Sequence, residues 1–390
     1  MDDAKKVNWL LFAYLAVFPF GQLARFEITV SSYKIPLLIP DLILGLFVLL
    51  FVIGKFKMPK IWPRAFGFLL LVLFSSLVAN FVFQTPAYEV LVGFLYWLRL
   101  FANFIFFVAV SNQVGSTKSF SATIFKSLIA ISVFVGVFGW IQYLVYPDLR
   151  SLYEWGWDDH LYRLAGTFLD PGFTSILLVF GFLASLSSFL RNHKRKYIYI
   201  AVCLFLFVTV LFTYSRAGYL ALAVGTTFLF IQKSRFKSVV FVVVLLIALL
   251  LLPRPEGEGV RLERVASIVK RLSNYGQTVE IIKKSPLFGV GYNNLCFAKK
   301  YFYPESYFGS HSCGGSDSSL LFILATGGVL GSSAFIHLLY KSRLAKSSLY
   351  GSTFLATGIA LLTHSLFVNS MFYPWVLGWM MALAALSVRE

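Results

Sequence analysis

The sequence has little charge for its length. Charged side chains make up 13% of its 390 residues, whereas soluble globular domains contain about 25%. Hydrophobic residues make up 58%, and the mean hydropathy is +0.77. This composition excludes a water-soluble enzyme, a disordered chain and a fibrous protein, and it indicates a polytopic membrane protein.

Cysteine is scarce as well. Three cysteines that are scattered along the chain do not form a disulfide framework. Cys203 lies in an apolar run, whereas Cys296 and Cys313 lie in a polar segment before Leu320. If that segment is extracytoplasmic the two could pair, but we favour the simpler expectation of two free or buried thiols.

Acidic residues are few, and basic residues outnumber them. The chain has 34 Lys and Arg against 17 Asp and Glu, a formal net charge of +17. In a soluble domain this excess would suggest nucleic acid as a partner. Here the basic residues lie mostly between apolar runs, where helix orientation and anionic lipid headgroups account for them. We therefore expect membrane lipids, and no nucleic acid, as partners.

Long apolar runs recur along the whole chain. A helix needs about 20 apolar residues to cross the hydrocarbon core, so the chain has room for roughly a dozen helices and one sizeable loop. We expect an all-α polytopic membrane protein with a single integral membrane domain over residues 1–390. Its twelve expected transmembrane helices are 8–21, 35–53, 66–83, 89–110, 121–146, 172–190, 197–214, 216–232, 237–252, 317–340, 350–368 and 370–387.

The basic residues alternate between the connections, and this alternation predicts an orientation. Short connections rich in Lys and Arg are expected in the cytoplasm. One set of connections carries Lys5 and Lys6; Lys55, Lys57, Lys60 and Arg64; Lys118; Arg191, Lys194, Arg195 and Lys196; Lys233, Arg235 and Lys237; and Lys341, Arg343 and Lys346. We therefore expect this set and both termini in the cytoplasm, and the other connections outside.

The one long polar segment, 253–316, is expected to be an extracytoplasmic loop between the ninth and tenth spans. Within it, residues 263–272 have apolar residues at helical spacing with basic residues around them, as in a helix lying at the lipid headgroups. A second short helix is expected from Tyr275 to Lys284, before Ser285, Pro286 and a Gly-x-Gly turn. A loop of this size is as compatible with a functional role as with a surface loop that only packs on the outer ends of the helices.

Three polar side chains stand at the ends of spans on the expected outer side: Arg163, Arg216 and His311. A guanidinium group suits a diphosphate, because its planar fork gives paired charge-assisted hydrogen bonds and it stays charged at any relevant pH. The alternative is that each arginine extends its charged head to the membrane surface. Both interpretations remain open for either arginine.

Arg99 differs because it lies about midway along the fourth span. An unpaired arginine at that depth costs at least a few kcal/mol, so it is a candidate for substrate binding. A structural ion pair with Asp41 or Asp170 is the competing interpretation. The other intramembrane candidates, His337 and His364, are expected to be core residues.

A metal ion is not expected. The Asp158, Asp159 and His160 run suggests metal ligands, but adjacent carboxylates in a loop are a weak signal, and we favour a solvated loop. No metal-ligand spacing, phosphate-binding glycine loop or nucleophile elbow appears. The candidate chemistry therefore consists of arginines that bind an anion and one histidine or carboxylate base, with no cofactor.

A series of short motifs lies between residues 160 and 340. They are Arg163-x-x-Gly166 before Asp170-Pro171-Gly172, then Ser215-Arg216-Ala217-Gly218, Pro286-Leu287-Phe288-Gly289-Val290-Gly291-Tyr292-Asn293-Asn294, the segment with His311 and Asp317, and Gly327-Gly328-Val329-Leu330-Gly331. In this order they resemble the O-antigen ligase and O-antigen polymerase family. Each motif is short, and their order makes the match specific.

The resemblance implies a multispanning transferase. Members of the family move a glycan from an undecaprenyl diphosphate carrier onto an acceptor on the outer side of the bacterial cytoplasmic membrane. Arg163 and Arg216 match the positions that the family uses to bind the diphosphate. A departure concerns the base, since the ligases commonly carry a histidine where this chain has Asp317. His311 lies six positions earlier, so the base remains open between these two residues.

The expected reaction is therefore a metal-independent, inverting glycosyl transfer with a lipid-diphosphate donor. An acceptor hydroxyl attacks the anomeric carbon, His311 or Asp317 takes its proton, and the arginines stabilise the departing diphosphate. A ligase and a polymerase differ only in the acceptor, which the sequence does not specify. A lipid or solute transporter is the rival from another class. The spans contain few carboxylates and we find no internal repeat, which disfavours a transporter.

The alternation of basic residues predicts the result of a topology experiment. A reporter fused after Lys196 or Lys346 should report a cytoplasmic position, and one inserted near Glu258 should report an external position. A cytoplasmic signal at Glu258 would contradict the orientation and the outward placement of the candidate residues.

Overall fold

Helices form most of the molecule. The computed structural model describes residues 3–30, 33–114, 118–191, 195–231, 233–303, 315–341 and 348–388. The helices in these ranges are α1 (Asp3–Val17), α2 (Ile39–Ile53), α3 (Trp62–Val82), α4 (Ala87–Gln113), α5 (Lys118–Val145), α6 (Pro171–Arg191), α7 (Lys196–Leu211), α8 (Arg216–Ile231), α9 (Arg235–Leu251), α10 (Ala266–Lys284), α11 (Leu295–Phe302), α12 (Ser319–Lys341), α13 (Leu349–His364) and α14 (Pro374–Ser387), with short 3-10 helices η1 (Phe18–Ala24), η2 (Arg150–Trp155), η3 (Gly166–Phe168) and η4 (Glu258–Val260).

Each of the twelve expected spans overlaps one of these helices, α1 to α9 and α12 to α14. Within the described ranges, six helical segments are long and apolar enough to cross a membrane, and α2, α7, α8 and α14 are shorter apolar helices. The all-α membrane class is therefore supported. The count of twelve crossings stays a prediction.

One expected span begins differently. Residues 35–38 belong to a strand, not to the helix expected over 35–53. Strands β1 (Arg25–Val30) and β2 (Tyr33–Leu38) form an antiparallel hairpin, in which Arg25 faces Leu38. Helix α2 starts only at Ile39, because Pro40 suits the first turn of a helix and the Asp41 carboxylate accepts from the Leu38 backbone N–H at 3.0 Å.

The expected outer segment also differs from its prediction. The two short helices expected at 263–272 and 275–284 are one continuous helix, α10, of 19 residues. No proline separates the two halves, and one internal glycine costs a helix only about 1 kcal/mol. The helix ends before Ser285 and Pro286 as expected. Helix α11 was not expected, and residues 304–314 lie outside the described ranges.

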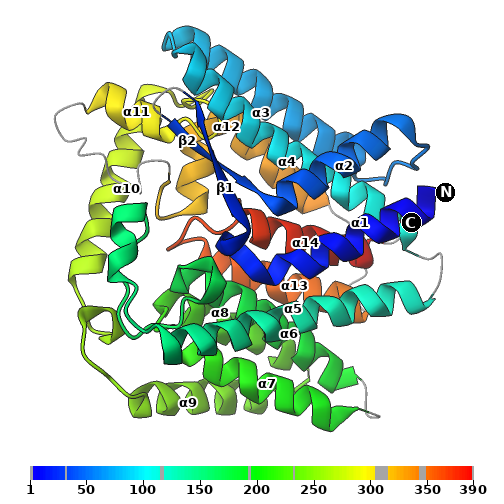
Figure 1. The fold of residues 1–390 in the computed structure, drawn as a ribbon, viewed down its shortest axis with the longest axis vertical. Coiled ribbons are helices and arrows are strands. Elements are labelled where there is room, and N and C mark those ends of the chain that lie inside the picture. Colours follow the sequence, from blue (N-terminus) through cyan, green and yellow to red (C-terminus); the bar gives the residue numbers. More distant parts are fainter. Residues whose placement is uncertain are drawn as a thin grey trace.

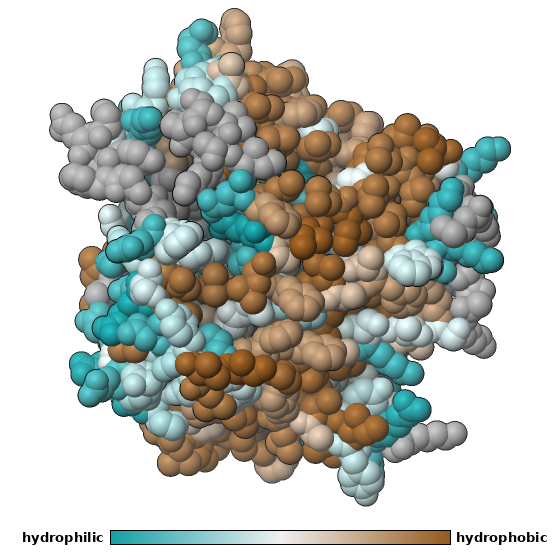
Figure 2. Space-filling view, in the orientation of Figure 1, coloured by the Kyte–Doolittle hydropathy of each residue, from teal (hydrophilic) through white to brown (hydrophobic). Residues whose placement is uncertain are grey.

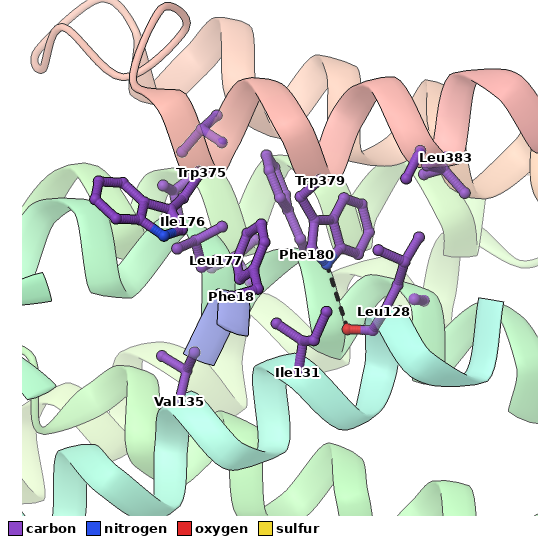
Figure 3. Close-up of a cluster of buried hydrophobic side chains, with 14 of the residues drawn as sticks. Phe18, Leu128, Ile131, Val135, Ile176, Leu177, Phe180, Trp375, Trp379 and Leu383 are labelled. Carbon is purple, nitrogen blue, oxygen red and sulfur yellow. Dashed lines mark hydrogen bonds between the residues drawn. The ribbon is translucent and has the colours of Figure 1, made fainter. Parts of the chain in front are cut away.

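The core lies where α5, α6 and α14 meet. Trp375 and Trp379 of α14 are fully buried, and the Trp379 ring packs on Phe180 of α6 with centroids 4.8 Å apart. The Trp379 Nε1–H donates to the Leu128 carbonyl of α5 at 3.3 Å (Figure 3). Helix α6 is central. In its most apolar stretch of 18 residues, 83% is buried inside the protein, against 33–44% in the corresponding stretches of the other five long helical segments.

Helix α12 is interrupted, and the segment 286–291 fills the interruption. Gly328 has φ 62° and ψ −166°, which breaks the helical hydrogen bonding. The segment supplies partners in both directions. Val290 N donates to Ala325 O (2.9 Å), Gly291 N to Thr326 O (3.0 Å), Val329 N to Pro286 O (2.9 Å) and Leu330 N to Leu287 O (3.2 Å). Two of the sequence motifs, 286–294 and 327–331, therefore contact each other through the backbone.

The helices give the molecule two distinct ends. Figure 1 shows both termini at one end, and α10 and α11 at the opposite end. On the face shown in Figure 2, a broad hydrophobic region lies between hydrophilic residues at these two ends. This distribution fits a protein whose middle is in contact with lipid.

The broken helix gives a stability prediction with an internal control. A Cβ on Gly328 would lie 2.2 Å from the Leu287 carbonyl oxygen, and its backbone conformation is essentially restricted to glycine. We expect Gly328→Ala to lower the free energy of unfolding by about 3 kcal/mol, measured by denaturant unfolding in detergent. The neighbouring Gly327→Ala is the control, because nothing lies within 4 Å of its Cβ position. Equal stability of the two variants would contradict the role of the break.

Candidate functional site

Arg163 is held at the end of α7. The chain before it folds back on itself, since the Leu149 N–H donates to the His160 carbonyl at 2.8 Å. Arg163 then donates from Nε to the Thr213 carbonyl at 3.1 Å and from Nη2 to the Tyr214 carbonyl at 3.3 Å. Carbonyl groups at the end of a helix lack partners within the helix. Arg163 satisfies them, and its guanidinium is thereby fixed in position.

Arg216 is the first residue of α8 and joins that helix to α10. The Ser215 hydroxyl accepts from the Gly218 N–H at 3.2 Å, which caps the helix. The Arg216 guanidinium donates to the Arg264 carbonyl at 3.1 Å and to the Ser267 hydroxyl at 2.6 Å. The short turn between α7 and α8 therefore brings Arg216 against the start of the outer segment.

Two further arginines of the outer segment lie near this pair. Arg264 donates to the Gly259 carbonyl at 2.6 Å. Burial, and then the positive charges of Arg163, Arg216 and Arg271, lower the pKa of Arg264 to about 10. Burial also lowers the pKa of Arg163, and Arg271 contributes to this shift. Four cationic groups therefore lie close enough to perturb one another.

Arg271 of α10 has no hydrogen bond or ion pair within the part of the chain that the structure describes. Its charge acts on the arginines and also on Asp317 and Tyr275. The sequence predicts Arg264 and Arg271 in a helix at the lipid headgroups, not in the site. The regular spacing of apolar and basic residues indicates a helix, but it does not indicate which face of that helix contacts the protein.

Acidic groups border the arginines on one side. Asp170 precedes α6, and its Oδ1 accepts from the Phe173 N–H at 2.9 Å. Burial and the charge of Asp158 raise the pKa of Asp170. Burial and the charges of Arg163 and Arg264 hold the pKa of His160 well below its usual range, so this imidazole is neutral. His160 is 7% exposed, and the expectation of a solvated loop is wrong for this residue, although Asp158 is exposed.

Asp317 contacts α10 at Asn274 and Tyr275. The Tyr275 hydroxyl lies 3.2 Å from the Asp317 carbonyl, and the Asp317 N–H donates to the Asn274 side chain at 3.1 Å. Burial raises the pKa of the Asp317 carboxyl, and the charges of Arg271 and Lys299 act in the opposite direction. The other candidate base, His311, lies outside the described residues.

Lys299 of α11 binds the segment that precedes Asp317. Its ammonium donates to the Gly315 carbonyl at 2.9 Å, and burial lowers its pKa to about 8 despite the charge of Asp317. Nearby, Cys296 is disulfide-bonded, so the expectation of a free thiol is wrong there. Cys203 is free, and Cys313 lies outside the described ranges.

Arg99 lies apart from the other arginines. It donates from Nε and Nη2 to both oxygens of Asp41, at 2.8 and 2.6 Å, and from Nη2 to the Pro36 carbonyl at 2.8 Å. This is the structural ion pair that the sequence left open. These contacts engage Arg99 with the hairpin and α2, and its assignment to diphosphate binding stays a prediction.

The two intramembrane histidines also differ from each other. His364 is fully buried, with Nδ1 3.0 Å from the Ser370 hydroxyl, which confirms its expected place in the core. His337 is exposed on α12, so its expected place in the core is wrong.

Comparisons with known proteins agree with the order of the motifs. No curated protein sequence matches the chain. Residues 201–336 match the family model described as O-antigen ligase. The matched range contains Arg216, Arg264, Arg271 and both motifs that meet at the break in α12, whereas Arg163 precedes it. The resemblance to the O-antigen ligase family is therefore confirmed over this range.

Proposed function

We propose that the protein transfers a glycan from an undecaprenyl-diphosphate-linked donor to an acceptor hydroxyl on the outer side of the bacterial cytoplasmic membrane. The match of residues 201–336 to the O-antigen ligase family model supports a transferase of this general type in a multi-pass membrane protein. The donor, the acceptor class and the orientation are the parts that we add.

The observation that carries the proposal is the gathering of Arg163, Arg216, Arg264 and Arg271. Such a cluster is unfavourable without an anion, because like charges repel and partial burial weakens their hydration. A diphosphate carries more than one negative charge and accepts paired hydrogen bonds from a guanidinium. Each guanidinium has five N–H donors, so Arg163 and Arg216 keep donors free beyond their contacts with the protein.

The reaction follows from this arrangement. The acceptor oxygen forms a bond to the anomeric carbon while the bond from that carbon to the diphosphate oxygen breaks. The electron pair leaves with the diphosphate, whose charge the arginines stabilise, and Asp317 or His311 takes the hydroxyl proton. Direct displacement inverts the anomeric centre. The fixed guanidinium groups supply the electrostatic stabilisation, so the proposed step requires no metal ion.

Three observations favour the outward orientation. Helices α10 and α11 lie at the end of the molecule opposite both termini (Figure 1). The expected cytoplasmic connections carry the excess of basic residues. The disulfide at Cys296, in α11, is typical of an oxidising compartment outside the cytoplasm.

A polymerase of the same family is a second candidate function. The specific observation in its favour is Asp317, which stands where ligases commonly carry histidine and lies within the range of the Arg271 charge. The direct test mixes the purified protein with a lipid-diphosphate-linked glycan and candidate acceptors. We expect a transferred product and released undecaprenyl diphosphate. Movement of the lipid across a membrane without transfer would instead favour a transporter.

The arginines predict the outcome of substitutions in that assay. We expect Arg163→Ala and Arg216→Ala each to lower kcat/KM by about 100-fold, because each removes donors to the developing charge of the diphosphate. Lys at either position should restore activity only in part, since it lacks the planar fork. Arg150→Ala is the control, because Arg150 is exposed and forms an ion pair with Asp148, two positions away. Full turnover in both Ala variants would contradict the proposed role.

The pH dependence of the transfer rate should identify the base. A base must be deprotonated, so the rate should rise with pH through its pKa. For Asp317 this rise lies above the pKa of an ordinary aspartate, because burial raises the pKa of its carboxyl, and for an unperturbed histidine at position 311 it lies at about pH 6.5. We expect one of Asp317→Asn and His311→Ala to abolish transfer while donor binding is retained. Activity in both variants would exclude a base in this segment.

A further inference from the structure

We infer that Asp158, His160 and Asp170 bind one first-row divalent cation beside Arg163. In each residue one potential ligand atom lies within 4.8 Å of those of the other two. The three come from two segments, the loop before η3 and the residue that precedes α6. A single ion could therefore contact all three after small movements of the side chains.

The orientation of His160 supports a ligand between these groups. Its side chain is 8% exposed, and its Nε2 is buried without a hydrogen-bond partner. Nε2 lies 4.0 Å from Asp170 Oδ2, which is too far for a hydrogen bond. An unpaired buried nitrogen costs free energy, so native proteins usually give it a partner. A cation placed between the nitrogen and the carboxylates would supply one.

The other ring nitrogen of His160 leaves Nε2 available. Nδ1 lies 3.4 Å from Arg163 Nη1, which is long for a hydrogen bond. A cation at Nε2 requires the ring proton on Nδ1. In that tautomer the lone pair of Nε2, which has no hydrogen-bond partner in the described part of the chain, is directed at the Asp170 carboxylate.

The carboxylates are placed for the same ion. Asp170 uses Oδ1 to accept from the Phe173 N–H, and its Oδ2 faces His160. Asp158 is exposed, so an ion can enter from solvent at that edge. The two negative carboxylates balance the two positive charges of the cation. The occupied site is therefore neutral and does not repel the neighbouring arginines.

The donor set indicates the kind of cation. An imidazole nitrogen suits Zn²⁺ and its neighbours, whereas oxygen ligands alone suit Mg²⁺ and Ca²⁺. With one nitrogen and two carboxylates, we expect Zn²⁺ to bind more tightly than Mn²⁺, and both more tightly than Mg²⁺. The ion would join the loop that carries Arg163 to the start of α6. This role is structural and independent of the proposed transfer step.

The test is a titration of untagged, chelator-treated protein in detergent with ZnCl₂, followed by calorimetry. We expect one Zn²⁺ per chain. Asp158→Asn and His160→Ala should each weaken binding at least ~10-fold, because even outer-shell changes at metal sites cost 10-fold or more. Asp159→Asn is the matched control. It removes the same charge from the adjacent position, outside the cluster, and should bind as the unsubstituted protein does.

A second measurement separates binding from folding. Zn²⁺ should raise the Tm of the unsubstituted protein and of Asp159→Asn, but not that of Asp158→Asn. If His160→Ala does not fold, the exposed position 158 decides the outcome. Absence of binding, or equal binding by Asp158→Asn and Asp159→Asn, would overturn the inference. Such a result would leave the transfer proposal intact, because transfer by chelator-treated protein is measured separately.

Discussion

The candidate site depends on hydrogen bonds from arginine side chains to backbone carbonyl groups. Arg163 satisfies the carbonyls of Thr213 and Tyr214 at the end of α7, and Arg216 satisfies carbonyls before α10. Unsatisfied carbonyls are costly near lipid, so these contacts stabilise the helix ends and fix the guanidinium groups at the same time. The same bonds thus connect the fold to the positive charge of the site.

A second connection joins the outer segment to the helical bundle. The break at Gly328 exposes backbone groups of α12, and residues 286–291 satisfy them. Because this segment follows α10 directly, the position of α10 is coupled to α12, a helix long and apolar enough to cross a membrane. Arg271 lies in α10 and Asp317 lies just before α12, so this connection helps to place the Arg271 charge near the Asp317 carboxyl.

Part of the site could be predicted from single residues. Arg163 and Arg216 stand out because each is a charged residue at the end of an apolar run, and the structure brings both to the same cluster. Arg264 and Arg271 could not be assigned in this way, since an amphipathic helix has the same pattern whether its polar face meets lipid headgroups or protein. Arg99 was ambiguous for a related reason: its partner Asp41 is 58 positions away in the chain.

The sequence by itself determined the class of the protein and the approximate positions of its apolar helices, because each apolar run must be buried in lipid or protein wherever it lies. Its short motifs also indicated the resemblance that the family model supports over residues 201–336. Only the tertiary structure decided which charges meet. The pairing of Arg99 with Asp41, the cluster around Arg264 and the buried ring of His160 arise from contacts between distant segments, and no local pattern encodes such contacts.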